Sequence, residues 1–182
     1  MTFAIETNDQ YFKIAASIIC KNIIGQKSVC IVDLESFTSI RMLIERIKAY
    51  GDKFSFVFIS GKGIISSMLE KLAAATKKTT AEDFSKIIRK NNKIPYGSAI
   101  SYLKSIKHLS MLTRREKNSV YGVLVHSTLS GAASFIGVTP RINYQRTENI
   151  ARKLNLKSSM HVHYFMNSEF TIDDIRKMIY HV

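Results

Sequence analysis

The stretch that decides the fold is residues 112–156, LTRREKNSVYGVLVHSTLSGAASFIGVTPRINYQRTENIARKLNL. It opens with Thr113 followed three residues later by Glu116, which is the spacing of a capping box at a helix start. The capping box begins a helix, and Val120, Val123 and Leu124 form the apolar side of this helix. The segment therefore begins with an amphipathic helix that has a defined first turn.

Two further helices are predicted behind the first one. A break at Ser127–Thr128 precedes a short helix that contains Gly131–Ala133 and ends at Gly137, a residue that tolerates the left-handed conformation of a helix end. The small side chains of 131–133 are expected to let the first two helices approach closely. Thr139 then caps a third helix with Pro140 in its first position. This helix runs to about Leu154, and its predicted core-facing residues are Ile142, Ile150 and Leu154.

A helix, a short helix, a tight turn and a polar helix are the successive parts of a helix-turn-helix unit. The third helix is rich in side chains that can form hydrogen bonds, most of them donors for bases and phosphates, which favours contact with a nucleic acid. These side chains are Arg141, Asn143, Tyr144, Gln145, Arg146, Glu148, Asn149, Arg152 and Lys153.

The same residues resemble the LuxR/FixJ-type helix-turn-helix family, and the match needs no gap over residues 112–156. The family's opening Leu-Thr-x-Arg-Glu is matched at Leu112, Thr113, Arg115 and Glu116. Its Ala-x-x-Leu-Gly-Ile-Ser is matched by Ala133, Ile136, Gly137, Val138 and Thr139, and its Asn-Ile-x-x-Lys-Leu-x-Val by Asn149, Ile150, Lys153, Leu154 and Leu156. The chain departs from the pattern at Ile142-Asn143 (the family's Thr-Val), Arg146 (His) and Gly131 (Glu).

The resemblance implies a DNA-binding surface and a dimer. The expected DNA-binding residues are Thr128, Thr139, Arg141, Tyr144, Gln145, Glu148, Arg152 and Lys153. Among them, the resemblance places base reading at Tyr144, Gln145 and Glu148. Arg152 and Lys153 lie at least a turn further along, so they are expected to bind phosphates. Family members dimerise largely through a fourth helix, here about Ser159–Met166.

The first half of the chain alternates strand and helix patterns, which predicts a parallel sheet covered on both faces. Predicted strands are Phe3–Glu6, Ser28–Leu34 and Phe54–Ser60, and predicted helices are Gln10–Ile24, Ser39–Tyr50, Ile64–Ala75 and Ala81–Arg89. A fourth strand near Leu72–Thr76 is left open. The second half shows no convincing strand, and a short linker helix is expected at Tyr102–Leu109.

This half resembles a shortened, degenerate receiver domain, a module that often precedes the LuxR/FixJ-type unit. Its matching positions are Asp9, Asp33 as phospho-acceptor, Ser60 and Lys77, with Lys78 as a weaker match for the lysine. Asn8 stands where the family has a second carboxylate beside Asp9. Phosphoryl transfer needs Mg²⁺ held by carboxylates, so we expect a vestigial site that is not controlled by phosphorylation of Asp33.

The expected layout has a receiver-like α/β domain at 1–90, a linker at 91–111 and an all-α helix-turn-helix domain at 112–166. An extension at 167–182 follows, in which Thr171 and Asp174 are predicted to cap a helix over Ile172–Tyr180. The two cysteines, Cys20 and Cys30, lie in apolar surroundings and are expected to be buried, reduced thiols.

Charge and motifs exclude several function classes. The net charge of +13, larger over 91–182 than over 1–90, favours an anionic partner. Residues 118–140 carry no charged side chain, but their Ser, Thr, His and Gly content argues against a membrane span, and the N-terminus lacks the pattern of a signal peptide. We therefore expect a cytoplasmic protein. Neither a catalytic constellation nor a Walker motif around Gly61-Lys62-Gly63 is visible, and His161-x-His163 has no third ligand. An enzyme, a metal site and a cofactor are accordingly not expected.

Two functions remain. The first is a sequence-specific, dimeric transcriptional regulator that binds double-stranded DNA, with RNA polymerase as a further expected partner. The alternative is an interaction protein that pairs with another LuxR-type regulator without reading DNA itself. The unusual Ile142-Asn143 pair and the acidic Glu148 on the third helix keep the alternative open.

Overall fold

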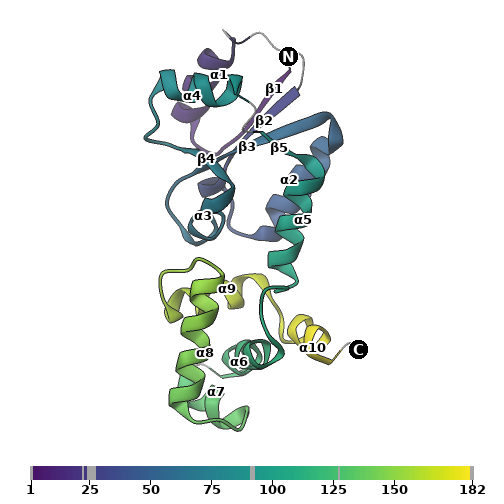
Figure 1. Ribbon diagram of the computed structural model, residues 1–182, viewed down its shortest axis with the longest axis vertical. Helices are drawn as coiled ribbons and strands as arrows, with labels where there is room; N and C mark the ends of the chain where they lie inside the picture. The colour runs from purple at the N-terminus through teal and green to yellow at the C-terminus, as the bar shows by residue number, and fades with distance from the viewer. Residues whose placement is uncertain (1, 22, 24–27, 91–92, 127, 181–182) are drawn as a thin grey trace. The chain divides into compact units, whose positions relative to one another are not determined.

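The computed structural model describes residues 2–21, 23, 28–90, 93–126 and 128–180 (Figure 1). Ser127 of the predicted break, residues 91–92 of the predicted linker and residues 181–182 lie outside these ranges. The chain divides into two compact units, Met1–Leu103 and Lys104–Val182. The division falls inside the segment expected to be a linker, because residues 94–103 pack as part of the first unit.

A five-stranded sheet forms the centre of the first unit. The strands β1 (Phe3–Glu6), β2 (Ser28–Asp33), β3 (Phe54–Ser60) and β4 (Ala73–Thr76) follow one another in chain order, and each pairs in parallel with the next. A short β5 (Ile94–Pro95) pairs antiparallel with β3. The predicted short parallel sheet is therefore present, and the strand that was left open is β4.

Two expectations about this unit are wrong. The predicted helix Ile64–Ala75 is only α3 (Ile64–Met68), because residues 73–76 complete the hydrogen bonding of the β3 edge. Ile94–Pro95 is also a strand, although none was expected after residue 90. In both places pairing with β3 overrides the local preference, since alanine favours helices and proline breaks strands.

Helices cover both faces of the sheet (Figure 1). On one face, α1 (Gln10–Lys21) and α4 (Ala81–Arg89) bury Ala16, Cys20, Phe84 and Ile88 against Val29, Ile31, Val57 and Ile59. On the other face lie α2 (Ile40–Tyr50) and α5 (Tyr96–Lys107). The linker helix therefore begins six residues earlier than predicted, because Ala99, Ile100 and Leu103 are buried. Cys20 and Cys30 are free, buried thiols, as expected.

The second unit consists of helices throughout the residues that the structure describes. They are α6 (Arg114–Val125), α7 (Leu129–Phe135), α8 (Pro140–Lys153), α9 (Ser159–Glu169) and α10 (Ile172–Tyr180). α6 contacts each of the other four. Within the C-terminal extension, α10 packs on α6 through the buried side chains of Ile175 and Ile179.

A glycine brings α6 and α7 together. A Cβ added at Gly122 of α6 would lie 3.0 Å from the carbonyl oxygen of Ala132 and 3.1 Å from Cγ2 of Ile136. Ala132 and Ala133 are buried at this contact, as the small residues were expected to be. The close approach of α6 and α7 nevertheless depends on Gly122, which has no side chain and which the sequence did not lead us to expect at this contact.

Candidate functional site

The turn between α7 and α8 is fixed by backbone geometry and by a cap. Gly137 has a φ of +69°, and the N–H of Val138 donates to the carbonyl of Ala133 at 3.0 Å. The N–H of Ile142 donates to Oγ1 of Thr139 at 3.3 Å, and Pro140 occupies the first turn. The predicted start of α8 is confirmed.

The two threonines expected to contact DNA both cap helices. Thr128 accepts the N–H of Gly131 at 3.0 Å at the start of α7, and Thr139 does the same for α8. Both residues are exposed at the N-terminal ends of their helices. Each threonine therefore has a structural role as the cap of its helix.

The orientation of α8 differs from the prediction at its first turn. Ile142 was expected in the core but is 41% exposed, whereas Asn143 is fully buried. The buried face of α8 comprises Asn143, Thr147, Ile150 and Ala151, and Leu154 follows it at the C-cap. Residues three and four apart share a helix face, and Ile142 lies outside this series.

Asn143 has a structural use inside the unit. Its side-chain Nδ2 donates to the carbonyl oxygen of Leu129 at 3.1 Å, which ties α8 to the first residue of α7. One turn later, Oγ1 of Thr147 donates to the carbonyl of Asn143 at 2.9 Å. The amide of Asn143 is therefore satisfied at Nδ2 by a helix-to-helix hydrogen bond, while its Oδ1 is buried without a partner.

The exposed side of α8 carries most of the residues predicted to read bases. Arg141, Tyr144 and Gln145 are exposed, and Glu148 is half-buried. Arg152 is exposed and its guanidinium donates to Asn149 on the same helix. The predicted orientation of Arg141, Tyr144 and Gln145 toward solvent is confirmed.

Lys153 lies in a different environment from the one predicted. Its Nζ donates to Oε2 of Glu116 at 2.7 Å, and its side chain is 37% exposed. Sequence reasoning placed this lysine on a phosphate, but its charge is compensated within the unit. Glu116 and Lys153 are both matched positions of the LuxR/FixJ-type pattern. Their presence together in that pattern was the one sequence signal that could have predicted this ion pair.

Glu116 joins three groups. Besides Lys153, its Oε2 accepts the backbone N–H of Thr113 at 2.7 Å and the hydroxyl of Thr113 at 2.9 Å, which confirms the capping box. Burial on its own raises the pKa of this carboxyl, but the hydrogen bonds from Lys153 and Thr113 outweigh burial and hold the pKa below its ordinary value. The carboxylate form is therefore the one that fixes α8 against the start of α6.

In the first unit, three of the four vestigial receiver positions converge. Nζ of Lys77 lies 3.0 Å from Oδ2 of Asp33 and 3.3 Å from Oδ2 of Asp9. It also lies 3.1 Å from Oε2 of Glu35, which sequence reasoning missed although it follows the strand end by two residues. Ser60 does not join them, because its hydroxyl donates to the carbonyl of Ala75 at 3.4 Å.

Every oxygen of the Asp33 carboxylate has a protein partner. Oδ2 accepts the hydroxyls of Thr7 at 2.7 Å and Ser36 at 2.9 Å in addition to Lys77, and Oδ1 accepts the N–H of Glu35 at 3.1 Å. The Asp33 side chain is 0% exposed. The carboxylate is thus fully buried, and both of its oxygens are engaged by protein groups.

The ammonium of Lys77 occupies the centre of this carboxylate cluster. Burial on its own lowers the pKa of Lys77, but its hydrogen bonds to Asp33, Glu35 and Asp9 outweigh burial and raise it above the ordinary value. The pKa of Asp9 is lowered, first by the backbone N–H of Phe12 and then by Lys77. Among the described residues, no group of three or more His, Cys, Asp or Glu side chains is arranged to hold a metal ion.

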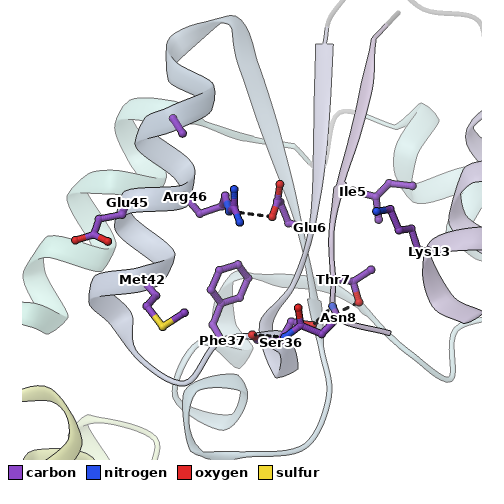
Figure 2. A pocket seen from close by; sticks show the side chains of 11 residues that line it. Ile5, Glu6, Thr7, Asn8, Lys13, Ser36, Phe37, Met42, Glu45 and Arg46 are labelled. Atoms are coloured by element: carbon purple, nitrogen blue, oxygen red, sulfur yellow. Dashed lines mark hydrogen bonds and ion pairs between the residues drawn. The ribbon is translucent and has the colours of Figure 1, made fainter. Parts of the chain in front are cut away.

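A pocket of about 590 Å³ lies beside the end of β1 (Figure 2). On one wall, Arg46 of α2 pairs with Glu6 of β1 at 3.0 Å, and at the base the N–H of Asn8 donates to Oγ of Ser36 at 2.8 Å. The pocket's lining contains neither His, Cys nor Asp. Thr7 and Ser36 line it and also bond to Asp33, so they cover that carboxylate from this side.

Comparisons with known proteins add little to these observations. No protein-family model and no curated protein matches the chain. Among solved structures, full-length FixJ from B. japonicum is similar over 92% of this chain and 96% of its own, with 13% sequence identity and a TM-score of 0.33. Similarity at that level settles neither the fold nor a function. Within the described residues, no helix is long and apolar enough to cross a membrane.

Replacing Glu116 by Gln should destabilise the second unit by roughly 1–3 kcal/mol at neutral pH, because the buried carboxylate loses its charge-assisted bonds. The folded pKa of Glu116 is lowered, so its stabilisation is present above the ordinary value of 4.5 and is lost as the pH falls below it. Urea unfolding followed by circular dichroism at pH 7 and at about pH 3 measures both effects.

The variant and the wild type should therefore differ at pH 7 and converge in acid. Glu148→Gln is the matched control. It also removes one negative charge, in this case from α8, but it does not remove an ion pair to another helix. An equal loss in both variants at pH 7 contradicts the role assigned to Glu116.

Proposed function

We propose that this protein is a dimeric, sequence-specific regulator of transcription that binds double-stranded DNA through α8. The observation that carries the proposal is the division of α8 into two sides. Arg141, Tyr144 and Gln145 face solvent, while Asn143 and the Lys153–Glu116 pair fix the opposite side to α7 and α6. A rigidly held helix with polar, outward side chains suits insertion into a DNA groove.

The chemistry of the exposed side fits the major groove, which is wide enough for a helix. Gln145 is suited to the paired donor and acceptor of adenine, and Glu148 to the amino group of cytosine. Lys153 is neutralised internally, so the positive charge left on α8 comes from Arg141, Arg146 and Arg152. The net charge of +13 supplies sequence-independent affinity for phosphates.

A dimer is supported by α9, the helix to which the family resemblance assigns the dimer contact. Met160 and Tyr164 lie one turn apart on it and are 64% and 59% exposed. Two large apolar side chains on one exposed helix face are typical of a surface that another protein covers. A cytoplasmic location and contact with RNA polymerase belong to the same proposal.

One observation favours the second candidate, an interaction protein that pairs with another regulator without reading DNA. Ile142 and Tyr144 on α8 are 41% and 50% exposed, and Glu148 repels phosphates. A helix surface that is apolar and acidic is better suited to bind a protein partner than to bind DNA. Selection of a DNA motif by the purified protein, alone or mixed with a partner regulator, separates the two functions.

The proposed regulator works without phosphorylation of Asp33. Lys77 neutralises part of the charge of the three carboxylates, and Asp33 already accepts bonds from Thr7, Ser36 and Glu35. A phosphoryl group on Asp33 would have to displace these bonds. The site also lacks a second carboxylate for Mg²⁺, because Asn8 stands at that position. The first unit then serves in folding and assembly rather than as a switch.

Incubation of the wild-type protein with acetyl phosphate and Mg²⁺ should give no phosphoryl adduct, because Asp33 is enclosed and engaged by Lys77. Intact-mass spectrometry measures the adduct, and Asp33→Asn, which keeps the shape of the side chain, should retain DNA affinity. An adduct that disappears in Asp33→Asn and changes the DNA affinity of the wild type contradicts this part of the proposal.

Selection from random double-stranded DNA should yield one enriched motif. In the variant Gln145→Ala, the preference at one base position should change, with a loss of about 1–3 kcal/mol on the wild-type site, because one base-edge contact is removed. Arg152→Ala is the matched control for a phosphate contact. It should weaken all sites alike and lower the slope of log K against log salt by about one.

Two results count against direct reading by α8. One is a failure to enrich any motif with or without a partner regulator. The other is an exchange of the two phenotypes, in which Arg152→Ala changes the motif and Gln145→Ala leaves it intact.

A further inference from the structure

Helix α1 is apolar on two sides. Its inner side buries Ala16 and Cys20 and packs Phe12 and Ile19 against the sheet. Its outer side exposes Tyr11, Ile14 and Ile18, which are 88%, 60% and 57% exposed, together with Ala15. We call these four outer residues the α1 stripe.

The α1 stripe has the spacing of a contact surface. Residues 11, 14, 15 and 18 follow the i, i+3, i+4, i+7 pattern that places side chains along one face of a helix. The outer side of α4, which covers the same face of the sheet, is different because it exposes Glu82, Asp83, Lys86 and Arg89. Single exposed apolar residues are normal on protein surfaces, whereas a continuous stripe on a helix already buried on its other side indicates a partner.

We propose that the α1 stripe docks on the α1 stripe of a second copy, with the two helices antiparallel about a two-fold axis. This inference deepens the proposed function and rests on its dimeric form, but it does not require α8 to read DNA. An antiparallel pair sets Tyr11 against Ile18 of the second copy and Ile14 against Ala15 of the second copy. The stripe is thus complementary to itself, as an interface about a two-fold axis requires.

Charges at the two ends of α1 select the antiparallel arrangement. Asp9 caps the start of the helix by accepting the N–H of Phe12 at 3.0 Å and also pairs with Lys77 at 3.3 Å, and Lys21 lies exposed in the last turn of the helix. Antiparallel pairing places each Lys21 beside the Asn8–Asp9 segment of the second copy and opposes the two helix dipoles favourably. Parallel pairing instead brings Lys21 to Lys21 and Asp9 to Asp9.

The size of the α1 stripe sets the strength of the contact. One tyrosine, two isoleucines and one alanine expose on the order of 400 Å². Two copies therefore bury roughly 800 Å², which is less than the ~1,200 Å² at which stable interfaces begin. The contact is weak by itself, so it becomes persistent only when a second contact, such as the one proposed for α9, raises the local concentration.

A cysteine cross-linking experiment on the full-length protein without DNA tests the proposal. Cys20 and Cys30 are 3% and 0% exposed, and burial raises their pKa to about 11 and about 12, so an added surface thiol reacts first. Ile14→Cys should give a covalent dimer with a short bis-maleimide, increasingly so at higher protein concentration. Met42→Cys, on α2 and 50% exposed, is the matched control and should not be cross-linked.

A second substitution makes the result specific. Ile18→Glu, added to Ile14→Cys, should abolish the cross-link while circular dichroism stays unchanged, because an exposed residue is replaced. Equal cross-linking of Ile14→Cys and Met42→Cys, or cross-linking that survives Ile18→Glu, overturns the proposal. Because DNA is absent, a failure here with motif selection intact leaves the DNA-binding proposal standing, and the converse also holds.

Discussion

The carboxylate of Glu116 is the interaction on which the second unit depends. With one oxygen it caps α6 through Thr113 and binds the ammonium of Lys153 at the far end of α8. α6 is also the helix against which α7, α8, α9 and α10 all pack. Because Glu116 is largely buried, this ion pair is weakly screened by solvent and defines where α8 lies. The side of α8 that remains free is the side to which we assign DNA.

The first unit also contains a buried carboxylate that joins several elements. Lys77 is bound by Asp33, Asp9 and Glu35, and the same Asp33 organises Thr7 and Ser36 at the ends of β1 and β2. A site of this kind holds strand ends together, and both oxygens of its buried Asp33 carboxylate already have protein partners. What the unit keeps exposed is instead the outer side of α1, which is why assembly is the role that its surface supports.

Much of this architecture follows from local sequence. Runs of β-branched and aromatic residues identified β1, β2 and β3, and threonines identified the starts of α6 and α8, because both signals act within a few residues. β4 and β5 were not predictable with certainty, since their residues become strands only by hydrogen bonding to β3. The Lys153–Glu116 and Lys77–Glu35 pairs join residues far apart in the chain, so no local pattern contains them. Ile142 was misplaced because the apolar residue was taken for the buried one, whereas Asn143 is the residue with a hydrogen-bond partner in α7.

The central claim is that α8, held by Glu116, enters the major groove of DNA. Dimethyl sulfate probing of the selected DNA site tests it most directly, because the reagent methylates guanine N7 in the major groove and adenine N3 in the minor groove. The proposal predicts that the bound protein protects guanine N7 in each half-site while adenine N3 stays reactive. Protection confined to adenine N3, or an unchanged pattern of guanine methylation on a fully bound site, contradicts the account.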